Sequence, residues 1–152
     1  IQPVIKRYFG GDTGLKTRRN QAMSYLIKEA IVFNDPDLEW DYAKVLVTKG
    51  DLLGINNGQV VAGTGQNLDF TWADNSAQGE ATIDDKLVLV VYEPTLKVSV
   101  YSLNAGTRAS AAASLVLPNY LSGLQVHVWA AFVAANDKRY ATSMYLGAVT
   151  VG

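Results

Sequence analysis

The sequence predicts a mainly β protein, an antiparallel β-sandwich preceded by an amphipathic α-helix. Several short apolar segments follow Pro36, separated by turn residues and without a helical pattern between them, which is typical of a sandwich. A single apolar stripe of helical period precedes Pro36. The composition, with 49% hydrophobic and 18% charged residues, is that of a globular chain and excludes a disordered one.

The helix is predicted over residues 15–33. Its apolar residues recur at spacings of three and four, the pattern of one helix face, at Ala22, Met23, Leu26, Ile27, Ala30 and Ile31. The run Asn34-Asp35-Pro36 is expected to end it, because proline cannot continue a helix.

Residues 1–9 are a short apolar segment followed by Gly10-Gly11. Periodicity leaves its conformation open. A strand would place Ile1, Pro3, Ile5 and Phe9 on one side, and a helix would group Ile1, Val4, Ile5 and Tyr8. Because the chain begins with Ile1 rather than Met, we expect that its start is processed or incomplete.

Strands are predicted over residues 42–48, 67–72, 87–92, 98–103, 113–117, 124–135 and 143–151. Residues 50–58 are rich in turn formers, and Gly63-Thr64-Gly65 is expected to be a hairpin turn rather than a dinucleotide-binding loop. Residues 87–92 are continuously apolar, which predicts burial on both faces of the sheet.

Residues 124–135 are also apolar on both faces. If Val126, Val128, Ala130 and Phe132 face the core, then Trp129, Ala131 and Val133 face outward, with Val88 and Val90 beside them. A sheet that is apolar on both faces needs a cover, which we expect to be either the chain's own helix or another subunit. His127 falls on the same outer face and is interpreted as a face residue, not as a catalytic base.

We place one boundary between an N-terminal apolar segment with its helix, residues 1–37, and the sandwich, residues 38–152. Residues 1–33 contain six basic and two acidic residues, a balance of +4, and the remainder contains seven basic and twelve acidic, a balance of −5. This asymmetry fits either an interaction arm or a segment that docks on its own domain. The net charge of −1 argues against binding of nucleic acid, and no apolar run is long enough to span a membrane.

No motif in the sequence predicts a catalytic, cofactor-binding or metal-binding residue. The chain has one histidine and no cysteine, which excludes a metal site built from several histidines and a Cys–His pair. Asp12-Thr13-Gly14 spells the triplet of aspartic proteases, but only once and before a basic segment, so we interpret it as a turn. Four acidic residues alternate along the chain after the predicted helix: Asp35, Asp37, Glu39 and Asp41. The glycine and the glutamate that a calcium-binding loop needs are missing from this segment, so we interpret these carboxylates as solvated.

Two resemblances follow from longer stretches. LDFTW at residues 68–72, VLVVY at 88–92, ASLVLP at 113–118 and VHVWA at 126–130 resemble strands B, C, E and F of an immunoglobulin-like or fibronectin type III-like sandwich. The resemblance covers residues 38–152, with Trp72 as the core tryptophan of strand B. It implies a fold and assigns no function.

Other phrases resemble an uncharacterised domain-of-unknown-function family of Bacteroidetes proteins: YAKVLV at residues 42–47, FTWADNS at 70–76, LVVY at 89–92, AGTR at 105–108 and YLGAVTV at 145–151. Members of that family have additional glycine-rich sequence before the position that corresponds to Ile1. The resemblance implies origin and fold, since the family brings no established activity.

Together these observations predict a non-enzymatic extracellular or cell-surface structural protein without a cofactor, a homo-oligomer in which identical subunits build a filament or pilus-like fibre. An apolar terminal segment that inserts into the next subunit would assemble such a fibre head to tail. The residues expected to insert are Ile1, Val4, Ile5, Tyr8 and Phe9. The receiving or lateral surface is expected to include Val88, Val90, Trp129 and Val133.

Two alternatives stay open. One is a secreted glycan- or protein-binding module that uses exposed aromatic rings, with Trp40, Tyr120 and Trp129 as candidates. The other is a structural protein of a phage or mobile element. Two or three exposed rings beside polar loops would favour the binding module.

Overall fold

A computed structural model of the chain describes residue 4, residues 30–34 and residues 37–152. The described part is mainly β. Its strands are β1 (Ile31–Asn34), β2 (Asp37–Trp40), β3 (Asn56–Ala62), β4 (Asn67–Ala73), β5 (Lys86–Glu93), β6 (Val98–Ser102), β7 (Ala112–Val116), β8 (Gln125–Val133) and β9 (Met144–Thr150). Three short 3₁₀ helices lie between strands, η2 (Tyr42–Lys44), η3 (Arg108–Ser110) and η4 (Asn119–Leu121).

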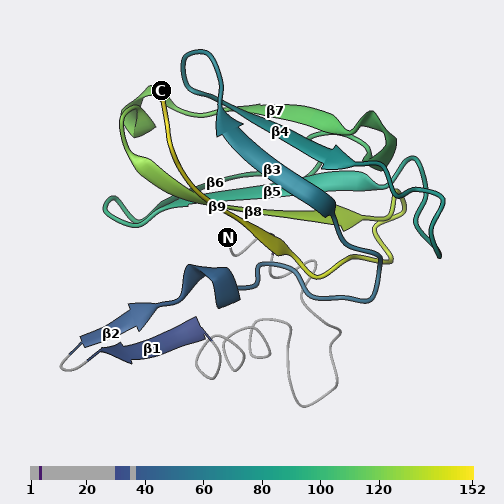
Figure 1. Ribbon diagram of the computed structural model, residues 1–152, viewed down its shortest axis with the longest axis horizontal. Coiled ribbons are helices and arrows are strands. Elements are labelled where there is room, and N and C mark those ends of the chain that lie inside the picture. The colour runs from purple at the N-terminus through teal and green to yellow at the C-terminus, as the bar shows by residue number, and fades with distance from the viewer. Residues whose placement is uncertain (1–3, 5–29, 35–36) are drawn as a thin grey trace.

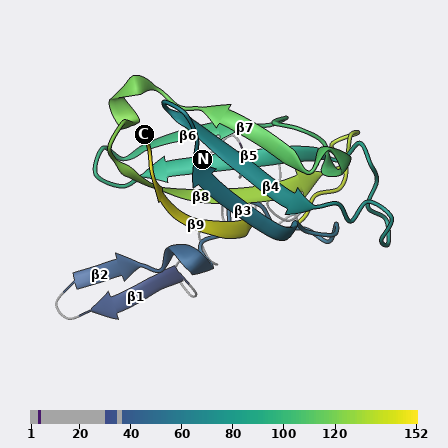
Figure 2. The same cartoon turned by 45° about the horizontal axis from the view of Figure 1, so that its top comes forward.

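Two antiparallel sheets stack on one another, as Figure 1 shows. One has three strands in the order β3-β4-β7, and the other has four in the order β6-β5-β8-β9. β1 and β2 form a separate antiparallel hairpin, which Figures 1 and 2 show standing away from the two stacked sheets. The predicted mainly β, sandwich-like fold is therefore confirmed.

Six of the seven predicted strands correspond to β4–β9, and Gly63-Thr64-Gly65 lies in the predicted hairpin turn, between β3 and β4. The strand predicted over residues 42–48 is wrong, because residues 42–44 form η2 and residues 45–48 continue as extended chain outside the two sheets. β3 was missed. Its Asn56-Asn57-Gly58 start is turn-like, since Asn57 adopts φ 53° and the pairing with β4 shifts register there.

The predicted helix over residues 15–33 is not confirmed. Residues 15–29 lie outside the described residues, and residues 31–33 belong to β1. The prediction that the helix includes residues 31–33 is wrong. Ile31-Val32-Phe33 is a β-branched and aromatic run, and it pairs with residues 38–40 of β2. The predicted boundary after residue 37 falls within this hairpin, before the sheets begin at β3.

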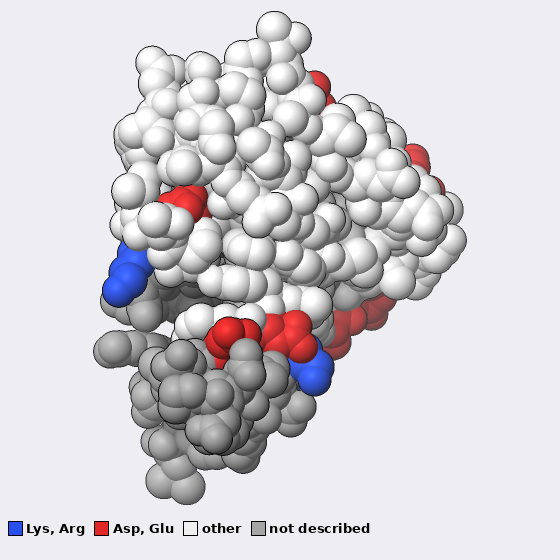
Figure 3. All heavy atoms as spheres, turned by 60° about the vertical axis from the view of Figure 1, so that its left-hand side comes forward, with Lys and Arg blue, Asp and Glu red and all other residues white. Residues whose placement is uncertain are grey.

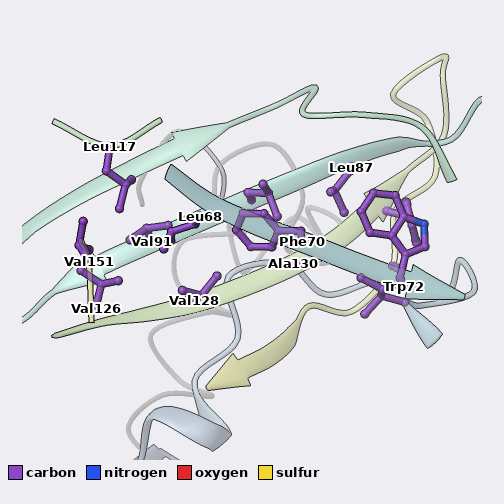
Figure 4. Packing of buried hydrophobic residues seen from close by; sticks show 14 of the residues in the cluster. Leu68, Phe70, Trp72, Leu87, Val91, Leu117, Val126, Val128, Ala130 and Val151 are labelled. Atoms are coloured by element: carbon purple, nitrogen blue, oxygen red, sulfur yellow. The ribbon is translucent and has the colours of Figure 1, made fainter. Parts of the chain in front are cut away.

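The main hydrophobic core fills the space between the two sheets (Figure 4). Alternate residues of β4, β5 and β8 point into it, and all of these are at most 6% exposed: Leu68, Phe70, Trp72, Leu87, Leu89, Val91, Val126, Val128, Ala130 and Phe132. This alternation is the one predicted for residues 67–72 and 124–135, and it fixes which residues of β5 and β8 face the other way.

A buried arginine ties the loops together at one end of the sandwich. The Arg108 Nε donates to Asp85 Oδ2 at 2.8 Å, and its two Nη atoms donate to Asn75 Oδ1 at 2.7 Å and to the Leu53 carbonyl at 2.8 Å. Its guanidinium also lies 4.1 Å from the ring centroid of Phe132. Since Arg108 is fully buried and well bonded, it serves as a structural anchor that the sequence did not reveal.

Candidate functional site

The outer face of the four-stranded sheet is apolar at its centre. β5 contributes Val88 and Val90, and β8 contributes Trp129 and Val133, each at most 1% exposed. Val90 and Trp129 lie opposite each other in the β5–β8 register. The predicted burial of residues 87–92 on both faces is confirmed, and so is the prediction that this set faces away from the inter-sheet core.

The cover over this face comes from the chain itself. Val4, fully buried, packs here together with Val47, and half-buried Tyr42 and Val45 pack around them. We call this set the outer cluster: Val4, Tyr42, Val45, Val47, Val88, Val90, Tyr92, Trp129, Val133 and Tyr145. The expected cover by the predicted helix falls on residues 15–29, outside the described residues.

The structure brings together five of the residues predicted for a subunit interface, Val4, Val88, Val90, Trp129 and Val133. Here Val4 lies on the apolar face of its own chain. The other predicted interface residues, Ile1, Ile5, Tyr8 and Phe9, lie outside the described residues.

Buried hydrogen bonds hold the covering segment, residues 42–48, against the sheet. Trp129 Nε1 donates to the Val45 carbonyl at 3.0 Å, so the largest ring of the face is bonded to its own cover. The backbone N–H of Val47 donates to Ser143 Oγ at 3.0 Å, and the N–H of Ser143 donates to the Thr48 carbonyl at 3.1 Å. These bonds join residues almost a hundred positions apart in sequence, and they explain why residues 45–48 run along the sandwich without joining a sheet.

Aromatic rings flank the apolar centre. The Tyr42 ring stacks on His127 with 3.7 Å between centroids and an interplanar angle of 14°. His127 Nδ1 lies 2.8 Å from the hydroxyl oxygen of Tyr145, whose ring in turn lies 5.4 Å from that of Trp129. His127 is a half-buried face residue, as its place in the strand predicted, and its ring is engaged on two sides.

Burial keeps this ring group uncharged at neutral pH. It lowers the pKa of His127, although the nearby carboxylate of Glu93 acts in the opposite direction. Burial also raises the pKa of Tyr42, helped by Tyr92 and Glu93, and burial raises the pKa of Tyr145. A neutral histidine between neutral tyrosines is suited to packing and to holding an apolar segment.

A second surface feature lies among the loops beside β5. A pocket of about 260 Å³ is lined by Asp51, Leu52, Leu53, Gln78, Gly79, Glu80 and Arg139. The Arg139 guanidinium forms ion pairs with both Asp51 and Glu80, and Asp51 and Glu80 are themselves exposed. The three charged side chains of the lining are paired with one another and leave a net charge of −1, so the pocket offers no free cation to a ligand.

The described part of the chain brings together no group of three histidine or carboxylate side chains that could hold a metal ion. Of the predicted acidic series, Asp41 lies 3.8 Å from Lys44 in an ion pair, and Asp35 lies outside the described residues, as does Asp12-Thr13-Gly14. None of the helices in the described ranges is both long and apolar enough to cross a membrane.

Two of the three rings proposed for ligand binding are exposed, Trp40 at 47% and Tyr120 at 59%. Trp129 is 1% exposed, so the prediction that it presents a ring to solvent is wrong. Trp129 is buried because residues 42–48, which were predicted to form a strand, lie over β8 instead.

Reasoning from the sequence also missed the covering residues Tyr42, Val45 and Val47 and the bonds of Ser143. The apolar character of residues 42–47 could have identified a second cover beside the helix. The hydrogen bonds of Ser143 could not be predicted, because a serine before a strand is a common turn residue and its position indicates no particular partner.

A family comparison matches residues 5–147 to DUF6266, described as a family of unknown function. This match spans most of the chain, and the chain therefore belongs to that family. No curated protein and no solved structure matches it. The predicted membership in a domain-of-unknown-function family is confirmed, and the site must be interpreted from its own geometry.

Proposed function

We propose that this DUF6266 chain is a non-enzymatic structural protein outside the cell or on its surface, the subunit of a filament or pilus-like fibre. In this proposal, subunits join head to tail through the N-terminal segment. The observation that supports it best is the position of Val4, an N-terminal residue fully buried on an apolar sheet face with Val88, Val90, Trp129 and Val133.

The connection between Val4 and the rest of the chain allows the same contact to form between molecules. Residues 5–29 separate Val4 from Ala30, and an extended chain reaches about 3.3–3.6 Å per residue, although a helix within it would shorten that reach. If the segment occupies the face of a neighbour, each subunit both gives and receives it. A head-to-tail contact of this kind produces an open fibre when the rotation between subunits does not close into a ring, and the proposal takes this open case.

Burial of Val4 alone is too weak to hold subunits together, since one valine contributes about 1.5–3 kcal/mol. The proposal therefore includes the neighbouring apolar residues Ile1, Ile5, Tyr8 and Phe9. The charge asymmetry supports the same arrangement, because a segment with a balance of +4 would approach a domain with a balance of −5.

The outer cluster also supports a non-enzymatic role. His127, the single histidine of the chain, is stacked on Tyr42 and bonded to Tyr145, so packing already engages both the face of its ring and Nδ1. A catalytic base needs a free nitrogen within reach of a substrate proton. His127 is also not among the residues that line the pocket beside Arg139.

We further infer an immunoglobulin-like or fibronectin type III-like sandwich. If the seven sandwich strands are lettered in chain order, β3, β4 and β7 take the places of A, B and E, and β5, β8 and β9 those of C, F and G. β6 pairs with β5 and would be the variable fourth strand. A Bacteroidetes origin is inferred only from the sequence phrases given above.

The experiment uses the absence of cysteine from the chain. The variant Val4→Cys with Val90→Cys should form a disulfide wherever the two positions meet. We expect a ladder of covalent oligomers on a non-reducing gel and filaments by electron microscopy. A control with Val4→Cys and Val61→Cys, where Val61 is exposed on the other sheet, should stay uncrosslinked. Disulfides formed only within monomers, together with strictly monomeric particles, would overturn the proposal.

A second candidate function is binding of glycan or protein in the extracellular space, supported by the exposed rings of Trp40 and Tyr120. Sugar rings stack on exposed aromatic faces, so a loss of glycan-array signal in Trp40→Ala and Tyr120→Ala would favour it. A signal that neither variant changes, or no signal from the unaltered chain, would reject these rings as a ligand site.

A further inference from the structure

β7 is an open edge of the three-stranded sheet. Among the described strands it pairs with β4 alone, and that pairing runs from Ala112 to Val116 without a register shift. Even its core-facing residues, Ala113 and Leu115, are only half-buried, and Val116 is 72% exposed. Because the equivalent core-facing residues of β4 are fully covered, the other side of β7 lies open to solvent.

The bonds at its two ends show which backbone groups of β7 point to β4. The Trp72 N–H donates to the Ala111 carbonyl at 3.1 Å, and the Leu117 N–H donates to the Gln66 carbonyl at 3.0 Å. In an antiparallel pair, successive residues alternate between bonding to the neighbour and pointing away from it. The odd-numbered residues from 111 to 117 therefore bond to β4.

The even-numbered residues Ala112, Ser114 and Val116 consequently direct their N–H and C=O groups toward the open edge. The Ala112 carbonyl accepts a bond from Ser110 Oγ at 3.2 Å, which caps one end of the row. By the same alternation, the side chains of these three residues lie on the solvent face of the sheet, where all three residues are exposed.

The other sheet edges have features that block strand addition. β3 and β9 lie beside each other, and each has a register shift, with φ of 53° at Asn57 and of 111° at Gly147. β6 begins directly after Lys97. Bulges and lysines are the usual means by which edge strands avoid one another. β7 has neither, and its sequence AASLV lacks proline, glycine and charge.

We propose that β7 docks on β7 of a second copy of this chain, in antiparallel register about a two-fold axis at Ser114. Ala112 of each copy then lies opposite Val116 of the other, and Ser114 lies opposite Ser114. The outward N–H and C=O groups of Ser114 pair reciprocally, and the Ala112 N–H donates to the Val116 carbonyl of the other copy, while the Ala112 carbonyl keeps its bond from Ser110 Oγ. The two three-stranded sheets then become one continuous sheet. This isologous contact goes beyond the proposed function and does not depend on the N-terminal segment.

The lack of charge on this edge favours a second copy over a charged partner as the occupant. Asp69 is the one charged residue of β3, β4 and β7, and Ser114 Oγ donates to it at 2.8 Å. In the paired sheet, three strand spacings, about 14 Å, separate the two Asp69 residues, which exceeds the Debye length of about 8–10 Å. An uncharged edge neither repels its own copy nor attracts a charged partner. Figure 3 shows a similarly charge-poor surface on one side of the sandwich.

The first test places a charge on the edge. In Ser114→Lys, the lysines of the two copies face each other across the two-fold axis. Val61→Lys, which like Ser114 lies opposite Asp69, is the matched control on the bulged edge strand β3 of the same sheet. Sedimentation equilibrium of the full chain should show a concentration-dependent dimer, weakened at least about tenfold by Ser114→Lys and unchanged by Val61→Lys. Equal dissociation constants for both variants, or a strictly monomeric unaltered chain, would overturn the proposal.

The second test reports on the register alone. Ser114→Cys places one cysteine of each copy on the two-fold axis, at a Cα separation near 5.5 Å that a disulfide spans. Thr71→Cys, exposed on the central strand β4, is the control. Mild oxidation should convert Ser114→Cys to a covalent dimer and leave Thr71→Cys monomeric. A Ser114→Cys yield no higher than that of Thr71→Cys would contradict pairing at this edge, whatever the N-terminal segment does.

Discussion

The two faces of the four-stranded sheet are covered in different ways. The inner face packs against β4 across a core of aliphatic and aromatic residues, most of them supplied by regular strands. The outer face is covered by Val4 and by a segment outside the sheets, held by buried hydrogen bonds and stacked rings. The first cover is built from the sheets themselves, whereas the second comes from Val4 and from a segment outside the sheets.

The largest expected effect is on the inner face. Phe70→Ala removes a ring that is 1% exposed at the centre of the inter-sheet core and should lower the free energy of unfolding by about 3–5 kcal/mol. Urea denaturation measures the loss. Val61→Ala, on an exposed position, should stay within about 0.5 kcal/mol of the unaltered chain. Similar losses in the two variants would mean that this core is not packed as described.

A smaller effect is expected where the covering segment is bonded to the sandwich. Ser143→Ala leaves the Val47 N–H without its buried acceptor and should cost about 1–3 kcal/mol. Because the bond belongs to the outer cover, the loss should be accompanied by faster hydrogen exchange at residues 45–48 and not in β4. Thr150→Ala, on an exposed position of β9, is the matched control. Protection lost equally in β4 would show that the two covers are not separable.

Removal of the N-terminal contact should have a moderate effect confined to the outer face. Val4→Ala deletes buried methyl groups and should cost about 1–2 kcal/mol, below the loss in Phe70→Ala. Acrylamide should quench Trp129 more strongly in this variant while the near-UV signal of the inter-sheet core is kept. Quenching that equals that of the unaltered chain would show that Val4 does not cover Trp129 in solution.

The smallest effect concerns pH. Since burial lowers the pKa of His127 below its usual 6.5, the unfolded chain binds a proton more readily than the folded chain near this pH. Uncharged His127 therefore contributes fully to stability above about pH 6.5, and this contribution is lost as the pH falls through the pKa of His127 in the folded chain. Denaturation midpoints at several pH values measure it.

His127→Gln should flatten this dependence above about pH 5, where Glu93, with its pKa lowered by the backbone N–H of Leu96, stays ionised. The groups facing His127 are Tyr42, Tyr92, Tyr145 and Glu93. Burial raises the pKa of Tyr42 and of Tyr145, so neither of these two titrates over this range. A slope of the same size in His127→Gln would assign the pH dependence to another group.

The contrast between the two faces also explains what the sequence could predict. The inner core follows from strand alternation, so LDFTW at residues 68–72 and VHVWA at 126–130 already gave its facing residues. The apolar outer positions Val88, Val90 and Trp129 were found by the same rule.

The cover of the outer face could not be predicted, because it depends on contacts distant in sequence. Residues 42–48 have the composition of a strand, and only the bonds to Trp129 and Ser143 show that they lie outside the sheets. The end of the predicted helix failed for a similar reason, since Ile31-Val32-Phe33 is apolar at helical spacing but pairs with β2. The burial of Arg108 could not be predicted either, because its acceptors come from two loops distant in sequence, the one that contains Leu53 and the one that contains Asn75 and Asp85.

The most direct test of the proposed assembly mixes two single variants, Val4→Cys and Val90→Cys, one of them enlarged by a tag. Neither chain can form the disulfide within itself, since each has one cysteine. Exchange of the N-terminal segment between molecules predicts a mixed covalent dimer of intermediate size under mild oxidation. Absence of that dimer, while the double variant closes its disulfide within single chains, would show that Val4 packs only on its own domain and would contradict the proposed fibre.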